Sequence, residues 1–120
     1  VYEKGQRRPQ PNPEVPAMIK AHCDGAGIIP RKVAPDEIVE RLIYAMVNEG
    51  ALLLEEGIAQ RASDIDVVYL TGYGFPAFRG GPMFYADQVG LYTISRALAA
   101  QAIDPAPMIV EMAADGSHFN

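Results

Sequence analysis

The sequence has few of the residues on which disulfide-rich, membrane-spanning or nucleic-acid-binding proteins depend. It contains one cysteine, Cys23, which excludes an internal disulfide and fits a reducing compartment. No apolar run approaches the roughly 20 residues that a membrane-spanning helix needs. The 15 acidic residues outnumber the 10 basic ones, and the formal charge of −5 argues against a nucleic-acid partner.

The remaining composition is that of a small globular protein. The chain has 120 residues, 49% of them hydrophobic and 21% charged, which is enough for one domain with a single core. Residues 4–11 are polar and rich in proline. We therefore predict a linker or extended arm over residues 1–12 and a helical domain over residues 13–120. The chain opens with Val1 rather than Met, so we expect it to be part of a longer polypeptide.

Apolar residues recur at helical spacing along most of the chain, and no segment alternates as a half-buried strand does. Prolines at positions 13, 35 and 82 suit the first turn of a helix, and Gly90 suits a helix end. The predicted helices cover residues 13–24, 35–59, 63–73, 82–89, 91–101 and 105–115. The predicted fold is all-α, an antiparallel bundle of about five to six helices.

Two local features of these helices lead to further expectations. Ser63 suits the N-cap of its helix, with Asp66 three residues later as a short-armed capping box. Gly50 lies on the apolar stripe of the long helix, between Met46 and Leu54. Because a glycine inside a helix is destabilising unless its missing side chain is needed, we expect another helix to cross closely at Gly50.

Glycine and proline are concentrated in residues 72–82, which we call the glycine-rich joint. A dinucleotide site needs Gly-x-Gly-x-x-Gly between a strand and a helix, whereas Gly72-x-Gly74 is a partial match between two predicted helices. A phosphate-binding loop is therefore the less favoured alternative. We favour a structural turn, in which glycines allow the chain to bend and prolines fix its direction.

The residues alone reveal no complete active site. His22, Cys23 and Asp24 are consecutive, so their side chains diverge on a helix and form neither a metal site nor a Cys–His pair. His118 lies in a C-terminal tail that we expect to be frayed. The polar residues along the long helix are expected on a solvated or interfacial face rather than in catalysis; they are Asn48, Glu49, Glu55 and Glu56.

Several longer motifs indicate a family. They are "NEGALLLEEGIA", the helix start "SDIDVV", "GYGFPAFRGGPM" and "YADQVGL". Together they resemble the C-terminal helical domain of 3-hydroxyacyl-CoA dehydrogenases. The likeness is strongest to the multifunctional fatty-acid oxidation enzymes, which join enoyl-CoA hydratase and dehydrogenase in one polypeptide. The opening "YEKGQRRPQPNPEV" is similar to the connector before that domain, and "PAPMIVEMAADGSHF" to its end.

The resemblance implies a division of labour in the whole enzyme. An upstream nucleotide-binding domain holds NAD and supplies the catalytic histidine and its glutamate partner, and helical domains cover the acyl-CoA. The multifunctional enzymes carry two helical units in tandem, and the first has a catalytic-site asparagine in an "NR" pair. This chain has Glu40-Arg41 there, so it resembles the second unit. We therefore expect no catalytic, cofactor-binding or metal-binding residue in this chain, and NAD only in the full-length enzyme.

The resemblance also implies contacts with other domains. The expected partners are a sister helical domain, the nucleotide-binding domain and, in the whole enzyme, the acyl-CoA substrate. The candidate interface or substrate-proximal residues are Asn48, Glu49, Tyr73, Phe75, Phe78, Arg79 and Asp87. Arg79 and Asp87 either pair with each other, cap a neighbouring helix or have a plain surface role.

The aromatic residues around the joint suggest self-association. They are Tyr73, Phe75, Phe78, Phe84 and Tyr85, and a small domain cannot bury all of them. We expect a two-fold homodimer for the isolated chain. Two functions stay open: a domain of a 3-hydroxyacyl-CoA dehydrogenase, which we favour, and a stand-alone helical binding or oligomerisation module. The expected location is the cytoplasm of a bacterium.

Overall fold

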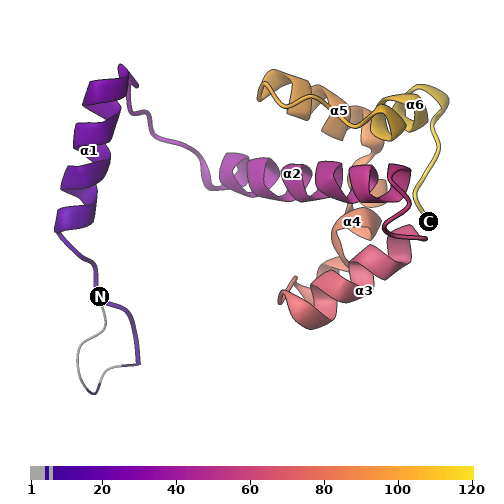
Figure 1. Cartoon of the computed structure of the whole chain (residues 1–120), viewed down its shortest axis with the longest axis horizontal. Helices are drawn as coiled ribbons and strands as arrows, with labels where there is room; N and C mark the ends of the chain where they lie inside the picture. The colour runs from indigo at the N-terminus through magenta and orange to yellow at the C-terminus, as the bar shows by residue number, and fades with distance from the viewer. Residues whose placement is uncertain (1–4, 6) are drawn as a thin grey trace. The chain divides into compact units, whose positions relative to one another are not determined.

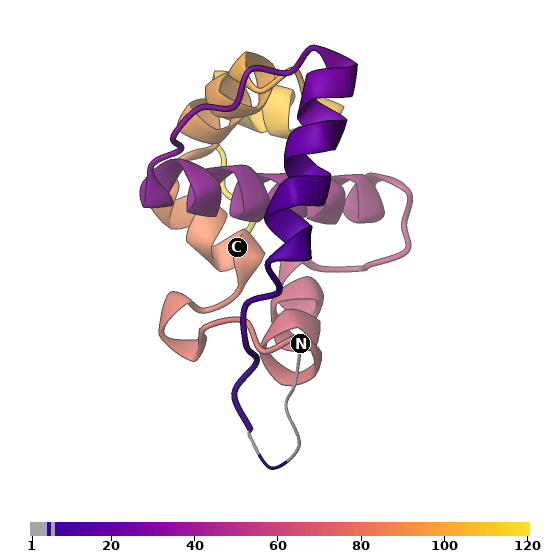
Figure 2. The ribbon, with the colours of Figure 1, turned by 90° about the vertical axis from the view of Figure 1, so that its left-hand side faces the viewer.

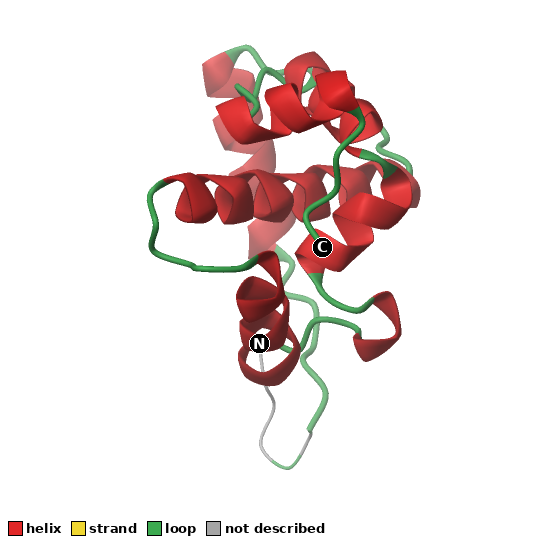
Figure 3. Ribbon diagram, turned by 90° about the vertical axis from the view of Figure 1, so that its right-hand side faces the viewer, coloured by secondary structure: helices red, strands yellow, loops and turns green. Residues whose placement is uncertain are grey.

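The structure, a computed structural model, describes residue 5 and residues 7–120, and the regular secondary structure of these residues is helical. Over these residues it forms six α-helices and one 3-10 turn, with no β-strand (Figures 1 and 3). The predicted all-α class and the number of helices are confirmed. The chain divides into two compact units, residues 1–33 and residues 34–120.

The first unit contains helix α1, Glu14–Ala26. The side-chain oxygen of Asn12 accepts the backbone N–H of Glu14 at 3.0 Å, which satisfies one free amide at the helix start. Gly27 ends the helix in the left-handed conformation, with φ of 67°. Helix α1 therefore matches the predicted segment and runs two residues further at its C-terminus. None of its residues is buried within this unit.

The second unit is built on helix α2, Pro35–Glu55, which has proline at its first position as predicted. The helix ends four residues earlier than the apolar pattern suggested. Gly57 adopts a left-handed φ of 71°, and the amides of Ile58 and Ala59 both bond to the carbonyl of Leu53. These hydrogen bonds supply donors for a carbonyl in the last turn of the helix, and the chain turns away from the helix axis.

Helix α3, Ala62–Gly72, starts one residue before the predicted Ser63. Its N-cap is Arg61, whose backbone N–H is bonded at 3.1 Å to the carboxylate of Asp64. The predicted cap is therefore wrong, because Ser63 lies inside the first turn. Asp66, the expected partner of Ser63, is bound to a different helix.

The remaining helices are α4, Pro82–Val89, α5, Leu91–Ala100, and α6, Pro107–Asp115. Within the second unit α2 runs through the middle, with α5 and α6 on one side of it and α3 and α4 on the other (Figure 1). The larger buried cluster joins α2, α4, α5 and α6 and includes Val47, Ile94, Leu98 and Ile109. The smaller cluster contains Ala62, Ile65 and Met83, and Phe119 packs against both clusters.

The glycine-rich joint connects α3 to α4, as predicted, and contains a 3-10 turn at Ala77–Arg79 (Figures 2 and 3). Gly81 has a φ of 107°, a conformation that residues with side chains rarely adopt. A Cβ atom at Gly81 would lie 2.3 Å from Oδ1 of Asp66. The glycine is thus required both by the backbone and by the close approach of α3.

Gly50 tests the close crossing expected from the sequence. A Cβ atom there would lie 2.6 Å from Sδ of Met83, a fully buried residue of α4. The close approach is confirmed. Replacing Gly50 with alanine gains about 1 kcal/mol in helix propensity, but overpacking costs roughly 1–3 kcal/mol. We expect Gly50→Ala to lower the free energy of unfolding by about 1 kcal/mol.

Urea unfolding followed by circular dichroism measures this change. Gly72→Ala is the matched control, because a Cβ atom at Gly72 meets no atom within 4 Å. If Gly50→Ala were as stable as Gly72→Ala, Met83 would not constrain α2 at this position.

Candidate functional site

Asn48 is buried inside the domain rather than exposed on the face of α2. Its amide nitrogen donates to the carbonyl of Asp104 at 3.2 Å, and its side-chain oxygen accepts the N–H of Ala106 at 2.7 Å. Ala106 is the N-cap residue of α6. Asn48 therefore ties the connection between α5 and α6 to the central helix, and both ends of its amide are satisfied.

The neighbouring glutamates of α2 separate into two environments. Glu49 is exposed, as expected for a solvated face. Glu55 is also exposed, but Oε1 accepts the backbone N–H of Met108 in the first turn of α6. A carboxylate at this place is stabilised by the positive end of the helix dipole. Thus Asn48 and Glu55 both hold the start of α6 against α2.

Asp87 binds the C-terminal tail. Oδ1 accepts the backbone N–H of Phe119 at 2.8 Å, and Oδ2 accepts the N–H of Asn120 at 3.0 Å. Nδ1 of His118 lies 4.0 Å from the same carboxylate. The tail was expected to be frayed, and this is wrong. The last three residues of the sequence all lie against Asp87 of α4. Asp87 neither pairs with Arg79 nor caps a helix.

Asp66 links α3 to the start of α4. Its Oδ1 accepts the N–H of Met83 at 2.7 Å and its Oδ2 accepts the N–H of Phe84 at 3.0 Å. Burial raises the pKa of this carboxyl above 3.8, the two backbone hydrogen bonds oppose the rise, and the nearby carboxylate of Asp87 adds to it. Sequence reasoning missed this role because a local capping box was the simpler interpretation of Asp66.

Arg79 lies between two aromatic rings. Its guanidinium carbon is 5.2 Å from the ring centroid of Phe78 and 5.0 Å from that of Tyr85, within the range of cation–π attraction. Phe78 is 84% exposed, whereas Phe75 is buried. Arg79, Phe75 and Phe78 line a cavity of about 210 Å³ together with apolar residues of α2. Tyr73, the remaining candidate of the joint, is 75% exposed.

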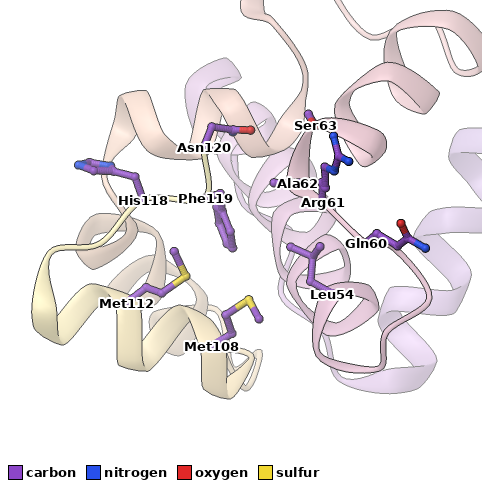
Figure 4. A pocket seen from close by; sticks show the side chains of 10 residues that line it. All are labelled: Leu54, Gln60, Arg61, Ala62, Ser63, Met108, Met112, His118, Phe119 and Asn120. Carbon is purple, nitrogen blue, oxygen red and sulfur yellow. The ribbon is translucent and has the colours of Figure 1, made fainter.

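A larger cavity of about 530 Å³ lies between the start of α3, helix α6 and the C-terminal tail. Figure 4 shows apolar side chains on one wall, among them Leu54, Met108 and Met112. Ser63 and His118 stand on opposite sides of this cavity in Figure 4, so they do not form a nucleophile–base pair. Among its described lining residues there is no aspartate or glutamate.

Residue 5 and residues 7–120 contain neither a cluster of metal-ligating side chains nor a membrane-spanning helix. No three histidine, cysteine, aspartate or glutamate side chains are placed together to hold a metal ion. None of these residues belongs to a helix that is long and apolar enough to cross a membrane. The side chains of Asn48, Asp66 and Asp87 accept hydrogen bonds from backbone amides of their own domain.

Comparison with known proteins identifies the family. The family model for the 3-hydroxyacyl-CoA dehydrogenase C-terminal domain matches residues 38–118, almost the whole second unit. The chain belongs to this family. The peroxisomal bifunctional enzyme of Danio rerio is 39% identical over 126 residues, which cover 98% of this chain and 18% of that protein.

Other relatives of this dehydrogenase domain are also long proteins. The peroxisomal bifunctional enzyme of Homo sapiens is 46% identical over 85 residues, covering 71% of this chain and 12% of that protein. A glyoxysomal fatty acid beta-oxidation multifunctional protein of Cucumis sativus is 40% identical over 94 residues, covering 75% of this chain and 13% of that protein. The chain thus spans less than a fifth of the length of these relatives, and the resemblance to multifunctional enzymes is confirmed.

The relatives correct one expectation about this dehydrogenase domain. They are peroxisomal or glyoxysomal proteins of eukaryotes, so the predicted location in a bacterial cytoplasm is wrong. A sequence motif of this domain reflects packing within the domain and does not indicate the compartment in which the protein works.

Asp66 offers a direct test of what holds the second unit together. An Asp66→Asn variant keeps one acceptor oxygen but places an NH2 group against the N–H of Phe84. Leaving a buried amide unsatisfied costs about 1–3 kcal/mol, so we expect a loss of this size in the free energy of unfolding. Because the folded pKa is raised, the stability from Asp66 is fully present below pH 3.8 and falls as pH rises through the folded pKa.

The measurement is urea unfolding of both proteins at about pH 4 and about pH 7, with a larger loss expected at the lower pH. Asp64→Asn is the matched control, because Asp64 is exposed and accepts one local amide, that of Arg61. An equal loss for Asp64→Asn and Asp66→Asn at both pH values would contradict the central role of Asp66.

Proposed function

We propose that this chain is a helical domain of a multidomain 3-hydroxyacyl-CoA dehydrogenase of fatty-acid β-oxidation, and that it contributes packing rather than catalysis. In the whole enzyme, NAD-dependent oxidation converts a 3-hydroxyacyl-CoA to a 3-oxoacyl-CoA. A nucleotide-binding domain outside this chain holds NAD and the catalytic histidine and glutamate. This domain packs on that nucleotide-binding domain and on a sister helical domain, and it helps to enclose the acyl-CoA.

The observation that carries this proposal is the use of the polar residues. Asn48 and Asp87 were candidate site residues, yet each of them, like Asp66, binds backbone groups of its own domain. General acid–base catalysis needs a titratable side chain positioned to exchange a proton with the substrate. Glu40, at the position of the asparagine in the first helical unit, supports the same assignment to the second unit.

The isolated 120-residue chain is therefore expected to bind no NAD and to oxidise no 3-hydroxyacyl-CoA. The reason is the missing nucleotide fingerprint, since no Gly-x-Gly-x-x-Gly follows a strand in the sequence. Isothermal titration calorimetry with NAD and absorbance assays of NADH formation measure the two activities. A complete 3-hydroxyacyl-CoA dehydrogenase is the positive control. Stoichiometric binding together with turnover by the pure chain would overturn the proposal.

Packing against a similar domain also leads us to expect a two-fold homodimer of the isolated chain. Phe78, which is 84% exposed, is the aromatic residue of the joint whose burial would gain most. Sedimentation equilibrium at micromolar concentration should show the dimer, and Phe78→Glu should shift it to monomer. Val110→Glu on α6 is the control, because Val110 is an exposed apolar residue of another helix. A single wild-type species near 13.0 kDa would contradict self-association.

A further inference from the structure

The cavity between the start of α3, helix α6 and the C-terminal tail has an apolar wall. Its volume of about 530 Å³ lies within the range of roughly 300–1,000 Å³ that small-molecule sites occupy. Leu54, Met108, Met112 and Phe119 form this wall, and each of them is only half-buried. Methionine side chains are flexible and polarizable, so a wall that contains two of them adapts to an apolar ligand. The domain thus leaves an apolar surface inside a cavity of ligand size.

Hydrogen-bond donors line the same cavity at the start of α3. Arg61 is the N-cap residue of this helix, and Ser63 lies in its first turn. Both residues line the cavity, and both are exposed. Figure 4 shows Arg61 and Ser63 at one end of the cavity, with Met108 and Met112 across it on α6. The cavity therefore presents donors at one end and an apolar surface at the other.

The charges around the cavity leave one cation unpaired. Three carboxylates accept backbone amides of residues that line it, those of Glu55, Asp64 and Asp87. None of these three acidic residues lines the cavity itself. Among the lining residues, His118 lies 4.0 Å from the carboxylate of Asp87. The guanidinium of Arg61 is the lining cation that forms no ion pair with any residue the structure describes.

We propose that this cavity binds a small amphiphile with one carboxylate head group and one apolar tail. The guanidinium of Arg61 receives the carboxylate, because its parallel N–H donors match the two carboxylate oxygens. The tail lies on the wall that includes Leu54, Met108 and Met112, and its apolar surface leaves water. One unpaired cation balances one negative charge, which favours a carboxylate over a phosphate monoester with its higher charge. The site is complete within this domain, so the proposal goes beyond the proposed function and does not depend on it.

Methyl NMR of the 120-residue chain tests the place of binding, because the chain has five methionines. Their methyl groups are labelled with carbon-13, and each resonance is assigned by a single Met→Leu variant. Titration with decanoate, below the concentration at which it forms micelles, should move the resonances of Met108 and Met112. Met18 is the internal control, because it is an exposed methionine on α1, in the first unit. A shift of Met18 as large as those of Met108 and Met112 would indicate unspecific adsorption and overturn the proposal.

Ligands with the same tail and different head groups test the role of Arg61. Dissociation constants are measured in the same titrations for decanoate, decanol and decylammonium, and decanoate should bind most tightly. We expect Arg61→Gln to weaken decanoate about fivefold and to leave decanol within about twofold of wild type. Arg96→Gln is the matched control, because it removes the same charge from an arginine of α5 that contacts Tyr92, and it should change neither constant. Equal affinities for decanoate and decylammonium, or equal effects of the two arginine variants, would overturn the proposal.

A cavity-filling variant tests the place of the tail. Met108→Phe puts a bulkier ring on the apolar wall and should weaken decanoate and decanol alike. Circular dichroism establishes that each variant is folded, and Arg61→Gln, which changes an exposed side chain, keeps the test independent of this substitution. Unchanged binding by folded Met108→Phe, or no shift of Met108 and Met112 in wild type at millimolar decanoate, would overturn the proposal. The assays with NAD decide the proposed function separately.

Discussion

The carboxylate of Asp66 joins two helices that the chain itself separates by the glycine-rich joint. Its two oxygens accept hydrogen bonds from the backbone amides of Met83 and Phe84. These amides have no carbonyl acceptor within α4 because they belong to its first turn. The contact requires the chain to pass very close to Asp66, and Gly81 provides the space because it has no side chain. The same approach brings Met83 against Gly50 of α2. One hydrogen-bonded contact thus sets where α4 lies relative to both α3 and α2.

The other end of the domain is held by the same kind of interaction. Asn48 and Glu55, both on α2, bind amides at the start of α6, and Asp87 on α4 binds the amides of the C-terminal tail. The first amides of a helix have no carbonyl acceptor within that helix, so they must find acceptors elsewhere. In this domain those acceptors are side chains of longer or neighbouring helices. Two of the candidate site residues, Asn48 and Asp87, are therefore committed to the fold.

This commitment accounts for the proposed absence of catalytic residues from this domain of an enzyme family. The buried side chains of Asn48 and Asp66 are satisfied by backbone groups, and the outer surface carries exposed apolar side chains, Phe78 among them. A surface of that composition suits contact with another protein domain better than proton transfer to a small molecule. The chain spans less than a fifth of the length of these relatives, and in the proposed function the chemistry depends on domains that lie outside it.

The sequence determined the features that depend on neighbouring residues. Helical periodicity, proline at the starts of α2 and α4 and the requirement for a small residue at Gly50 were all recognisable before the structure was known. Only the tertiary structure decided which helix each acidic residue binds. Asp66 caps α4 from 17 positions away in the sequence, and Asp87 holds Phe119 from 32 positions away. No local pattern encodes such pairs, because they form only when packing brings separate helices together, and for the same reason His118 was wrongly expected in a frayed tail.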